Sequence, residues 1–198
     1  MMLLAGIPIR VGTGYRWYSF LFNRRLFEHR RTAEKHEAEY NISLLREIGC
    51  DCRSIPPIAL SLTQAAKNAA ALEALRLGIG VDENVVILHP GSGGSARDWS
   101  VENFGDLATK LKSDGYKVVI TGNESEKSLV AEVVERSNGA AAPSAGRLSL
   151  KELAAFIGSA RLFVSNSTGP LHIAAAMGTA VIAFYPPIHE CSPRRWGP

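Results

Sequence analysis

Short apolar segments alternate with helical segments through residues 63–184, and this alternation constrains the fold more than any other feature of the sequence. The expected strands are 85–88, 117–120, 162–164 and 180–184, and the expected helices are 63–77, 101–112, 124–136, 149–157 and 168–177. Strands that are apolar along their whole length are typical of parallel sheets with both faces covered by helices. Because crossovers between parallel strands are right-handed, the pattern predicts a Rossmann-like, doubly wound α/β domain.

Pro56 and Pro57 interrupt regular structure and divide the chain into two parts. The first part contains an expected strand at 9–11 and an expected helix at 33–48, which are too few elements to enclose a core. We therefore expect 1–55 to be the incomplete end of one domain and 56–198 to form a second domain. Both ends of the chain are expected to be truncated, with the final helices of the second domain missing.

The excess positive charge lies in the first part of the chain. The formal net charge is +3, and residues 1–53 hold nine basic and six acidic side chains, whereas 54–198 hold equal numbers. A neutral main domain argues against a nucleic-acid partner. Arg16, Arg24 and Arg25 are interleaved with aromatic residues, a pattern that suits an anionic membrane surface or a phosphorylated lipid.

The composition favours a cytoplasmic protein. No apolar run approaches the roughly 18 residues that a membrane span needs. The residues before Pro8 lack the basic flank of a secretory signal. The three cysteines, Cys50, Cys52 and Cys191, form neither a disulfide framework nor a four-ligand zinc site, which suits a reducing compartment.

Polar or glycine-rich sequence follows the expected strands, and ligands of open parallel sheets bind at that edge. Residues 89–100 offer backbone N–H groups at glycines and Arg97 to an anion. The alternative there is a flexible connection with a surface arginine. Residues 121–126 supply Glu124 and Glu126. Either both complement the dipole of the helix that follows, or one of them accepts hydrogen bonds from ribose hydroxyls.

Residues 164–172 pass from strand to helix within a few positions. Ser167 or Thr168 can cap the helix, and Gly169 presents no side chain in its first turn. Backbone N–H groups at such a helix start form an anion site suited to a pyrophosphate. His172 can face the same ligand, or it can be a structural histidine bonded to a neighbouring loop.

Four motifs follow one another in a recognisable order. They are H-P-G-S at 89–92, T-G-x-x-x-E at 121–126, S-x-S-T-G-P-L-H-I-A-A-A-M-G at 165–178 and S-P-R-R-W-G-P at 192–198. In this order they resemble glycosyltransferase family 9, the bacterial lipopolysaccharide heptosyltransferases and their relatives. The resemblance covers essentially the whole chain, and the third motif is the most specific.

The resemblance implies a glycosyltransferase B architecture of two Rossmann-like domains. Residues 1–55 would be the end of the N-terminal, acceptor-side domain, and 56–198 would be the C-terminal domain that binds the nucleotide sugar. Such enzymes need no metal and no cofactor. The family's location implies peripheral contact with the inner face of the inner membrane, where Arg16, Arg24 and Arg25 would meet the membrane or the acceptor.

Roles for individual residues come from the same resemblance. It implies that the phosphates of the donor contact Ser92, Arg97, Thr168, Gly169 and His172. The ribose and base would contact Gly122, Glu126 and Leu148, and the sugar would lie near Ser167. Many relatives carry Asp where this chain has Ser167, so one carboxylate acceptor for sugar hydroxyls is absent. The catalytic base is unknown and is expected in an N-terminal segment outside this sequence, so the chain alone is expected to be inactive.

The implied function is transfer of a sugar, with heptose from ADP-heptose as the leading donor, to a lipopolysaccharide core or lipid A acceptor. Two alternatives remain open. One is a nucleotide-binding module without transferase activity. The other is an enzyme like the nucleotide-sugar epimerases, which predicts a preference for UDP and no lipid acceptor.

Overall fold

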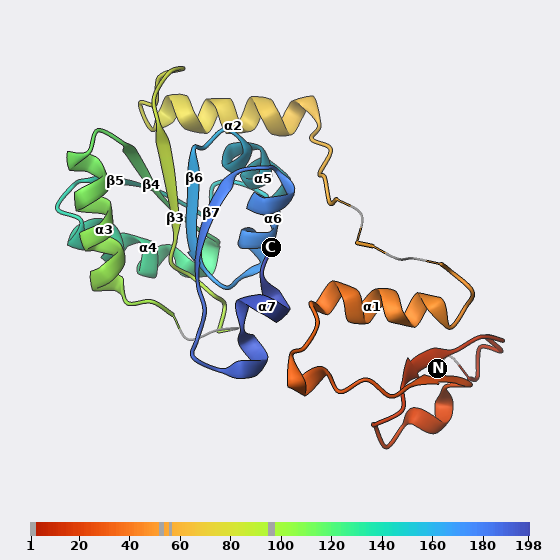
Figure 1. Cartoon of the computed structure of the whole chain (residues 1–198). Helices are drawn as coiled ribbons and strands as arrows, with labels where there is room; N and C mark the ends of the chain where they lie inside the picture. The colour runs from red at the N-terminus through yellow and green to blue at the C-terminus, as the bar shows by residue number, and fades with distance from the viewer. Residues whose placement is uncertain (1–2, 52–53, 56, 95–97) are drawn as a thin grey trace. The chain divides into compact units, whose positions relative to one another are not determined.

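The chain forms two compact units, shown in Figure 1 as a computed structural model that describes residues 3–51, 54–55, 57–94 and 98–198. One unit is Met1–Pro57 with Pro187–Gly197, and the other is Ile58–Pro186 with Pro198. The first division falls close to the expected boundary. The segment Pro187–Gly197, which the sequence analysis assigned to the second domain, instead groups with the first unit.

A five-stranded parallel sheet forms the centre of the second unit, with the strand order β5-β4-β3-β6-β7. Its strands are β3 (Val85–His89), β4 (Lys117–Gly122), β5 (Ala141–Ala145), β6 (Leu162–Asn166) and β7 (Ala180–Phe184). In the centre of the sheet, Ile87 of β3 pairs with Val119 on one side and Phe163 on the other. Along the chain, β3, β4 and β5 extend the sheet in one direction, and β6 and β7 then extend it in the other direction from β3. This arrangement confirms the predicted Rossmann-like, doubly wound α/β class.

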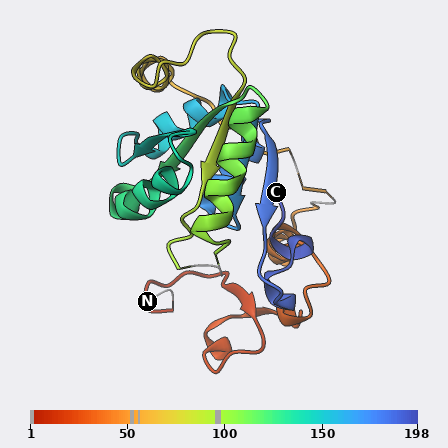
Figure 2. The same ribbon diagram turned by 90° about the vertical axis from the view of Figure 1, so that its left-hand side faces the viewer.

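Helices cover both faces of this sheet (Figures 1 and 2). They are α2 (Gln64–Arg76), α3 (Val101–Ser113), α4 (Lys127–Arg136, preceded by the 3-10 turn η3, Glu124–Glu126), α5 (Leu150–Gly158) and α6 (Gly169–Ala176). Phe104 of α3 and Val130 of α4 are buried against one face. Phe156 of α5 and Ala70 of α2 are buried against the other. The apolar strands are therefore enclosed on both sides, as their sequences predict.

The edge strand β5 is an element that the sequence analysis did not predict. Its residues are small, and Pro143 stands at its centre. A proline cannot donate to a sheet ladder, so within sheets it is confined to edges and strand starts. Because β5 pairs only with β4 among the described strands, the edge position accommodates Pro143.

A buried carboxylate ties α2 to β5. Glu73 is only 5% exposed and accepts a bidentate pair of hydrogen bonds from Arg76, at 2.8 and 2.6 Å. It also accepts hydrogen bonds from the Ser144 hydroxyl at 2.6 Å and from Arg147 Nε at 3.1 Å. Arg76 Nη2 in turn donates to the Pro143 carbonyl at 2.9 Å. Burial disfavours the charged form, but the hydrogen bonds outweigh it and lower the pKa of Glu73 to about 2.

The first unit holds a two-stranded parallel sheet and short helices. They are β1 (Val11–Thr13), η1 (Ser19–Leu21), β2 (Arg24–Leu26), η2 (Arg30–Thr32), α1 (Glu37–Arg46), η4 (His189–Cys191) and α7 (Pro193–Trp196). The expected helix at 33–48 starts later because Ala33 adopts a left-handed conformation, with φ of 47°, and His36 caps α1. The expected strand at 9–11 likewise begins at Val11.

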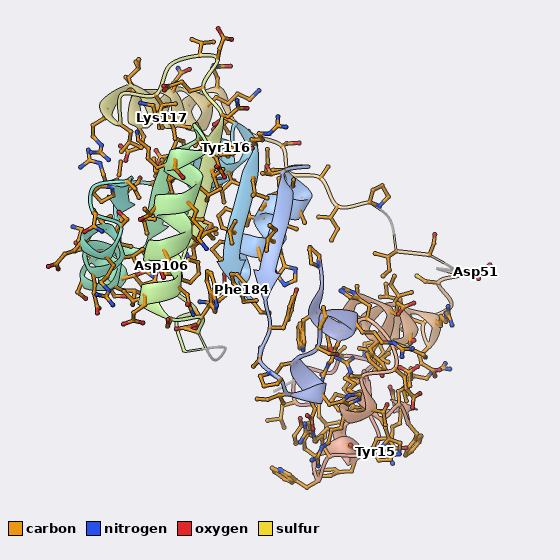
Figure 3. The ribbon with its side chains drawn as sticks, turned by 60° about the vertical axis from the view of Figure 1, so that its left-hand side comes forward. Tyr15, Asp51, Asp106, Tyr116, Lys117 and Phe184 are labelled. Carbon is orange, nitrogen blue, oxygen red and sulfur yellow. The ribbon has the colours of Figure 1, made fainter. Side chains whose placement is uncertain are left out.

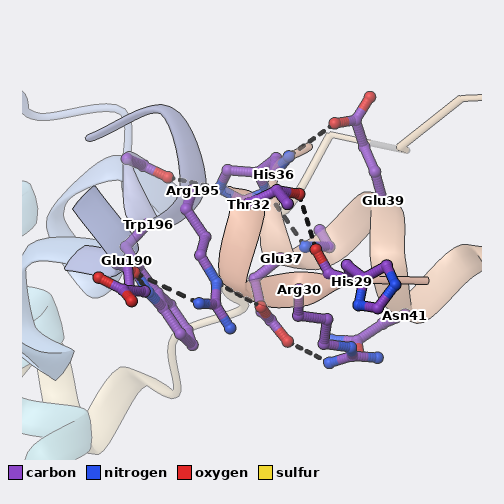
Figure 4. Close-up of polar contacts among 12 residues, drawn as sticks. His29, Arg30, Thr32, His36, Glu37, Glu39, Asn41, Glu190, Arg195 and Trp196 are labelled. Carbon is purple, nitrogen blue, oxygen red and sulfur yellow. Dashed lines mark hydrogen bonds and ion pairs between the residues drawn. The ribbon is translucent and has the colours of Figure 1, made fainter. Parts of the chain in front are cut away.

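Polar contacts join α1 to the segment 187–197 within this unit (Figure 4). Glu37 pairs with Arg30 and, at 2.9 Å, with Arg195. His36 Nε2 lies 2.7 Å from the Gly197 carbonyl, and His189 Nε2 lies 2.7 Å from the Thr32 carbonyl. These contacts account for the placement of 187–197 in the first unit. Among the described residues, no helix combines the length and apolarity needed to cross a membrane.

Candidate functional site

A cavity of about 390 Å³ opens where β3, β4 and β6 end. Ligands of doubly wound sheets bind at this edge, beside the point where the strand order reverses. The lining residues are His89, Gly91, Ser92, Gly93, Gly122, Asn123, Glu126, Leu148, Leu150, Leu153, Thr168, Gly169 and Pro170. The structure thus brings to one wall six residues that the sequence analysis assigned to a donor site, namely Ser92, Gly122, Glu126, Leu148, Thr168 and Gly169.

The loop after β3 approaches the start of η3 closely. A Cβ atom on Gly91 would lie 2.1 Å from Glu126 Oε1, so only glycine leaves this carboxylate in its present position. Ser92 is 8% exposed, and its hydroxyl oxygen accepts a hydrogen bond from the Gly94 N–H at 3.2 Å. The loop therefore presents backbone and a buried hydroxyl to the cavity.

Glu126 belongs to a capping box at the end of β4. Its Oε2 accepts a hydrogen bond from the Asn123 N–H at 2.9 Å, and Asn123 Oδ1 accepts hydrogen bonds from the Ser125 and Glu126 N–H groups. The capping hydrogen bond engages only one of the two carboxylate oxygens, so it does not exclude the ribose role considered in the sequence analysis. The capping bond fixes Oε2, and Oε1 lies beside Gly91.

Thr168 stands at the start of α6 and is 9% exposed. It is the N-cap residue, yet its side chain makes no capping hydrogen bond. Its buried hydroxyl has no hydrogen-bond partner among the described residues. A buried polar group without a partner is costly, and Thr168 is one of the residues that line the cavity. A small rotation that turns this hydroxyl toward the cavity would give it a ligand as its partner. Beside it, a Cβ atom on Gly169 would meet no protein atom within 4 Å.

His89 is a cavity residue to which the sequence analysis assigned no role. It is 5% exposed, and its Nδ1 lies 3.0 Å from the Thr121 hydroxyl. Burial lowers the pKa of His89, and the negative charge of Glu126 opposes this effect. The imidazole is therefore neutral near pH 7. A histidine at the end of an otherwise apolar strand is the sequence signal that could have identified it.

Other predicted residues lie elsewhere or outside the described ranges. Arg97 falls outside the described residues. His172 is exposed on α6, and in the described part of the chain it does not contribute to the cavity wall. Ser167 is half-buried beside the cavity residues, and a hydrogen bond links its side chain to Tyr185. Burial raises the pKa of Tyr185, and the bond with Ser167 partly opposes this.

The three arginines predicted to contact a membrane or acceptor lie in the first unit. Arg16, Arg24 and Arg25 are all exposed. The side chain of Arg25 donates a hydrogen bond from Nε to the Phe22 carbonyl at 3.0 Å. Their exposure leaves each guanidinium accessible to an external partner.

The chemistry of the wall suits a ligand with phosphate, hydroxyl and apolar parts. Across the described ranges, no lysine or arginine lines the cavity. Among the described residues, the groups that could meet an anion are backbone N–H groups, the side chains of Ser92 and Thr168 and the positive end of the α6 dipole. Leu148, Leu150 and Leu153 supply an apolar side. No group of three His, Cys, Asp or Glu side chains that could hold a metal ion occurs within the ranges described above.

Comparison with known proteins identifies similar sequences. A Haemophilus influenzae protein, whose name marks it as a candidate glycosyltransferase, is 31% identical over 98% of this chain and 58% of its own length. Lipopolysaccharide heptosyltransferase 3 of Escherichia coli is 26% identical over 93% of the chain and 55% of its own length. The chain thus spans little more than half the length of these relatives.

Solved structures share the fold. A glycosyl transferase family 9 structure from Veillonella parvula superimposes with a TM-score of 0.83 at 24% identity, covering 96% of this chain and 54% of that one. The Escherichia coli heptosyltransferase WaaC, solved with ADP, gives a TM-score of 0.61 at 16% identity, covering 90% and 55%. The sequence model named "Glycosyltransferase family 9 (heptosyltransferase)" matches residues 1–198. Since that match covers the whole chain, the protein described here belongs to glycosyltransferase family 9.

Proposed function

We propose that the cavity at the ends of β3, β4 and β6 binds the nucleotide diphosphate of a sugar donor. The observation that carries this proposal is Thr168, a residue of the cavity lining whose buried hydroxyl has no partner among the described residues. We further propose that the whole protein transfers the sugar, with ADP-heptose as the leading donor, to a lipopolysaccharide core or lipid A acceptor.

The pyrophosphate would lie at the start of α6. Gly169 leaves open space there, and the helix directs the positive end of its dipole to the same place. Ser92 also lines the cavity and would contact the phosphates, and Arg97 follows it in the sequence. Donors aimed at the leaving nucleotide diphosphate stabilise the charge that develops as the bond to the sugar breaks.

The nucleoside would lie between Glu126 and the leucine side of the cavity. Glu126 Oε1 would accept hydrogen bonds from the ribose hydroxyls, while Oε2 keeps its bond to the Asn123 N–H. Leu148, Leu150 and Leu153 would contact the base, because apolar walls with a few fixed polar groups are typical of nucleotide pockets.

Calorimetric titration with ADP, UDP and GDP tests the donor site. Wild type is expected to bind ADP best, and Thr168→Val is expected to weaken ADP binding at least about tenfold, which is about 1.4 kcal/mol. Valine keeps the shape of threonine and removes only the hydroxyl. ADP is tested first because WaaC, a heptosyltransferase of the same fold, was solved with ADP.

Ser165→Ala is the matched control for this titration. Ser165 is fully buried, and its hydroxyl also has no partner among the described residues, but it does not line the cavity. Its removal is expected to leave ADP binding unchanged. Equal losses in both variants, or no nucleotide binding by wild type, would contradict the donor-site proposal. A preference for UDP would favour the epimerase-like alternative.

We also propose that the first unit contacts an anionic lipid surface that carries the acceptor. Large aromatic side chains lie exposed near the three arginines in the sequence, namely Trp17 at 86%, Phe20 at 65% and Phe27 at 63%. Aromatic rings settle at the interface of a bilayer, and arginines are attracted to its anionic headgroups. The combination supports peripheral binding rather than insertion.

Sedimentation with lipid vesicles tests this contact. The chain is expected to bind vesicles that contain phosphatidylglycerol, to bind phosphatidylcholine vesicles weakly, and to be released by salt. The double variant Arg24→Glu, Arg25→Glu is expected to lose most of the binding. Lys151→Glu with Arg161→Glu changes the net charge equally on the second unit and is expected to retain it. Equal loss in both double variants would refute the assignment to the first unit.

A further inference from the structure

Asn166 connects three segments at the edge of the sheet. It is the last residue of β6, and its side chain is fully buried. Its amide nitrogen donates a hydrogen bond to the Pro90 carbonyl at 2.6 Å, and its amide oxygen accepts one from the Trp99 N–H at 2.9 Å. One side chain thus holds two backbone groups that belong to a distant loop.

These two backbone groups are the ends of the loop that follows β3. Pro90 comes directly before the cavity residues Gly91, Ser92 and Gly93, and Trp99 lies just before α3. The ring of Trp99 also stacks on Phe184, with ring centres 4.1 Å apart. Figure 3 shows Phe184 at the carboxyl end of β7, the end opposite to Tyr116 and Lys117. Both ends of the loop are therefore fixed at the carboxyl edge of the sheet.

The same residue sits two positions before Thr168. A change at Asn166 would alter the loop that carries Ser92 and the start of α6 together. Asparagine can donate to Pro90 and accept from Trp99 at the same time because its amide carries a donor and an acceptor on separate atoms. Aspartate lacks the donor, and alanine lacks both groups.

We propose that Asn166 is a positioning residue that sets the spacing between the loop after β3 and the start of α6, and so prepares the site for a nucleotide diphosphate. This inference rests on the donor site proposed above. Preorganised groups bind a ligand without the cost of being ordered at the moment of binding. Asn166 would therefore affect the diphosphate more than the nucleoside.

Calorimetry with ADP and with adenosine tests this difference. In Asn166→Asp, the dissociation constant for ADP is expected to rise at least about tenfold, while that for adenosine changes by less than about twofold. A general loss of structure would weaken the binding of both ligands. Asn103→Asp, at an exposed asparagine of α3, makes the same chemical change and is expected to leave both constants unchanged.

Amide hydrogen exchange at Trp99 gives a measurement that needs no ligand. Its N–H donates directly to Asn166, so exchange is expected to accelerate about tenfold or more in Asn166→Asp, with Ile87 in the core unaffected. If circular dichroism shows that Asn166→Asp is unfolded, Asn166→Ala is measured in its place, because it introduces no buried charge. Loss of the fold in both variants would overturn the proposal, because Asn166 would then be required for the fold itself.

The remaining outcomes separate the two proposals. Equal weakening of ADP and adenosine, or unchanged exchange at Trp99, would overturn the positioning role and leave the donor site intact. Wild type that binds neither ligand would overturn the donor site in this chain. In that case the exchange rate of the Trp99 N–H in the variants still decides whether Asn166 holds the loop.

Discussion

Phe104→Ala is expected to lower the free energy of unfolding of the second unit by about 3–5 kcal/mol. The ring is fully buried between α3 and the sheet, among apolar side chains. It meets the rings of Trp99 and Phe184 edge to face, with centres 5.0 and 6.1 Å away. Alanine would remove these contacts as well as the buried apolar area. Amide exchange at Ile87 and Ile120, which reports the second unit alone, measures the loss.

Phe104→Leu is the matched variant for this measurement. Leucine keeps most of the buried volume and is expected to cost less than about 1.5 kcal/mol. Equal costs for leucine and alanine would mean that the ring contacts, rather than the cavity, determine the loss. A cost below about 1 kcal/mol for alanine would contradict the close packing between α3 and the sheet.

Glu73→Gln is expected to lower the free energy of unfolding by about 2 kcal/mol at pH 7. The ordinary carboxyl pKa is near 4.5, and folding lowers the pKa of Glu73 to about 2. The folded state therefore stabilises the charged form, most directly through the bidentate pair with Arg76. The expected loss of stability is smaller than the free energy that corresponds to the whole pKa change. Arg76 and Arg147 are partly exposed, so water screens their attraction to Glu73.

The pH dependence of this effect has a definite sign. Since folding lowers the pKa, the stabilisation is complete above the pKa of the unfolded chain and is lost as pH falls from about 4.5 toward 2. Urea unfolding should show wild type and Glu73→Gln converging over this range. Glu132→Gln, at an exposed carboxylate of α4, is expected to change stability by less than about 0.5 kcal/mol at either pH. A difference for Glu73→Gln that stays constant down to pH 2 would contradict the role of its charge.

The fold could be predicted where the apolar pattern is uninterrupted. The strands at 85–88 and 117–120 are found within β3 and β4, because both runs are short and rich in β-branched residues, which favours a strand over a helix. Strand β5 was missed because alanines and Pro143 give no such run, and its edge position follows from pairing with a distant strand. The start of α1 was missed because a left-handed residue, Ala33, ends the preceding turn.

The candidate site could be predicted in part, for a related physical reason. Thr168 and Ser92 follow strands directly, so the general rule for parallel sheets places them at the ligand edge. Asn166 joins residues more than sixty positions away, and no local pattern encodes such contacts. His89 lies at a strand end as well, yet its burial and its contact with Thr121 depend on the neighbouring strand β4.

The contact between Arg76 and Pro143 also affects how the molecule meets other copies of itself. The N–H and C=O of one strand residue point to the same side, and the Pro143 carbonyl points outward, where Arg76 binds it. Proline has no N–H, so the outer edge of β5 at Pro143 offers neither a donor nor an available acceptor to an incoming strand. Open sheet edges otherwise act as templates for intermolecular pairing and fibre growth. A proline and a bound carbonyl at the middle of β5 therefore protect this side of the protein against aggregation.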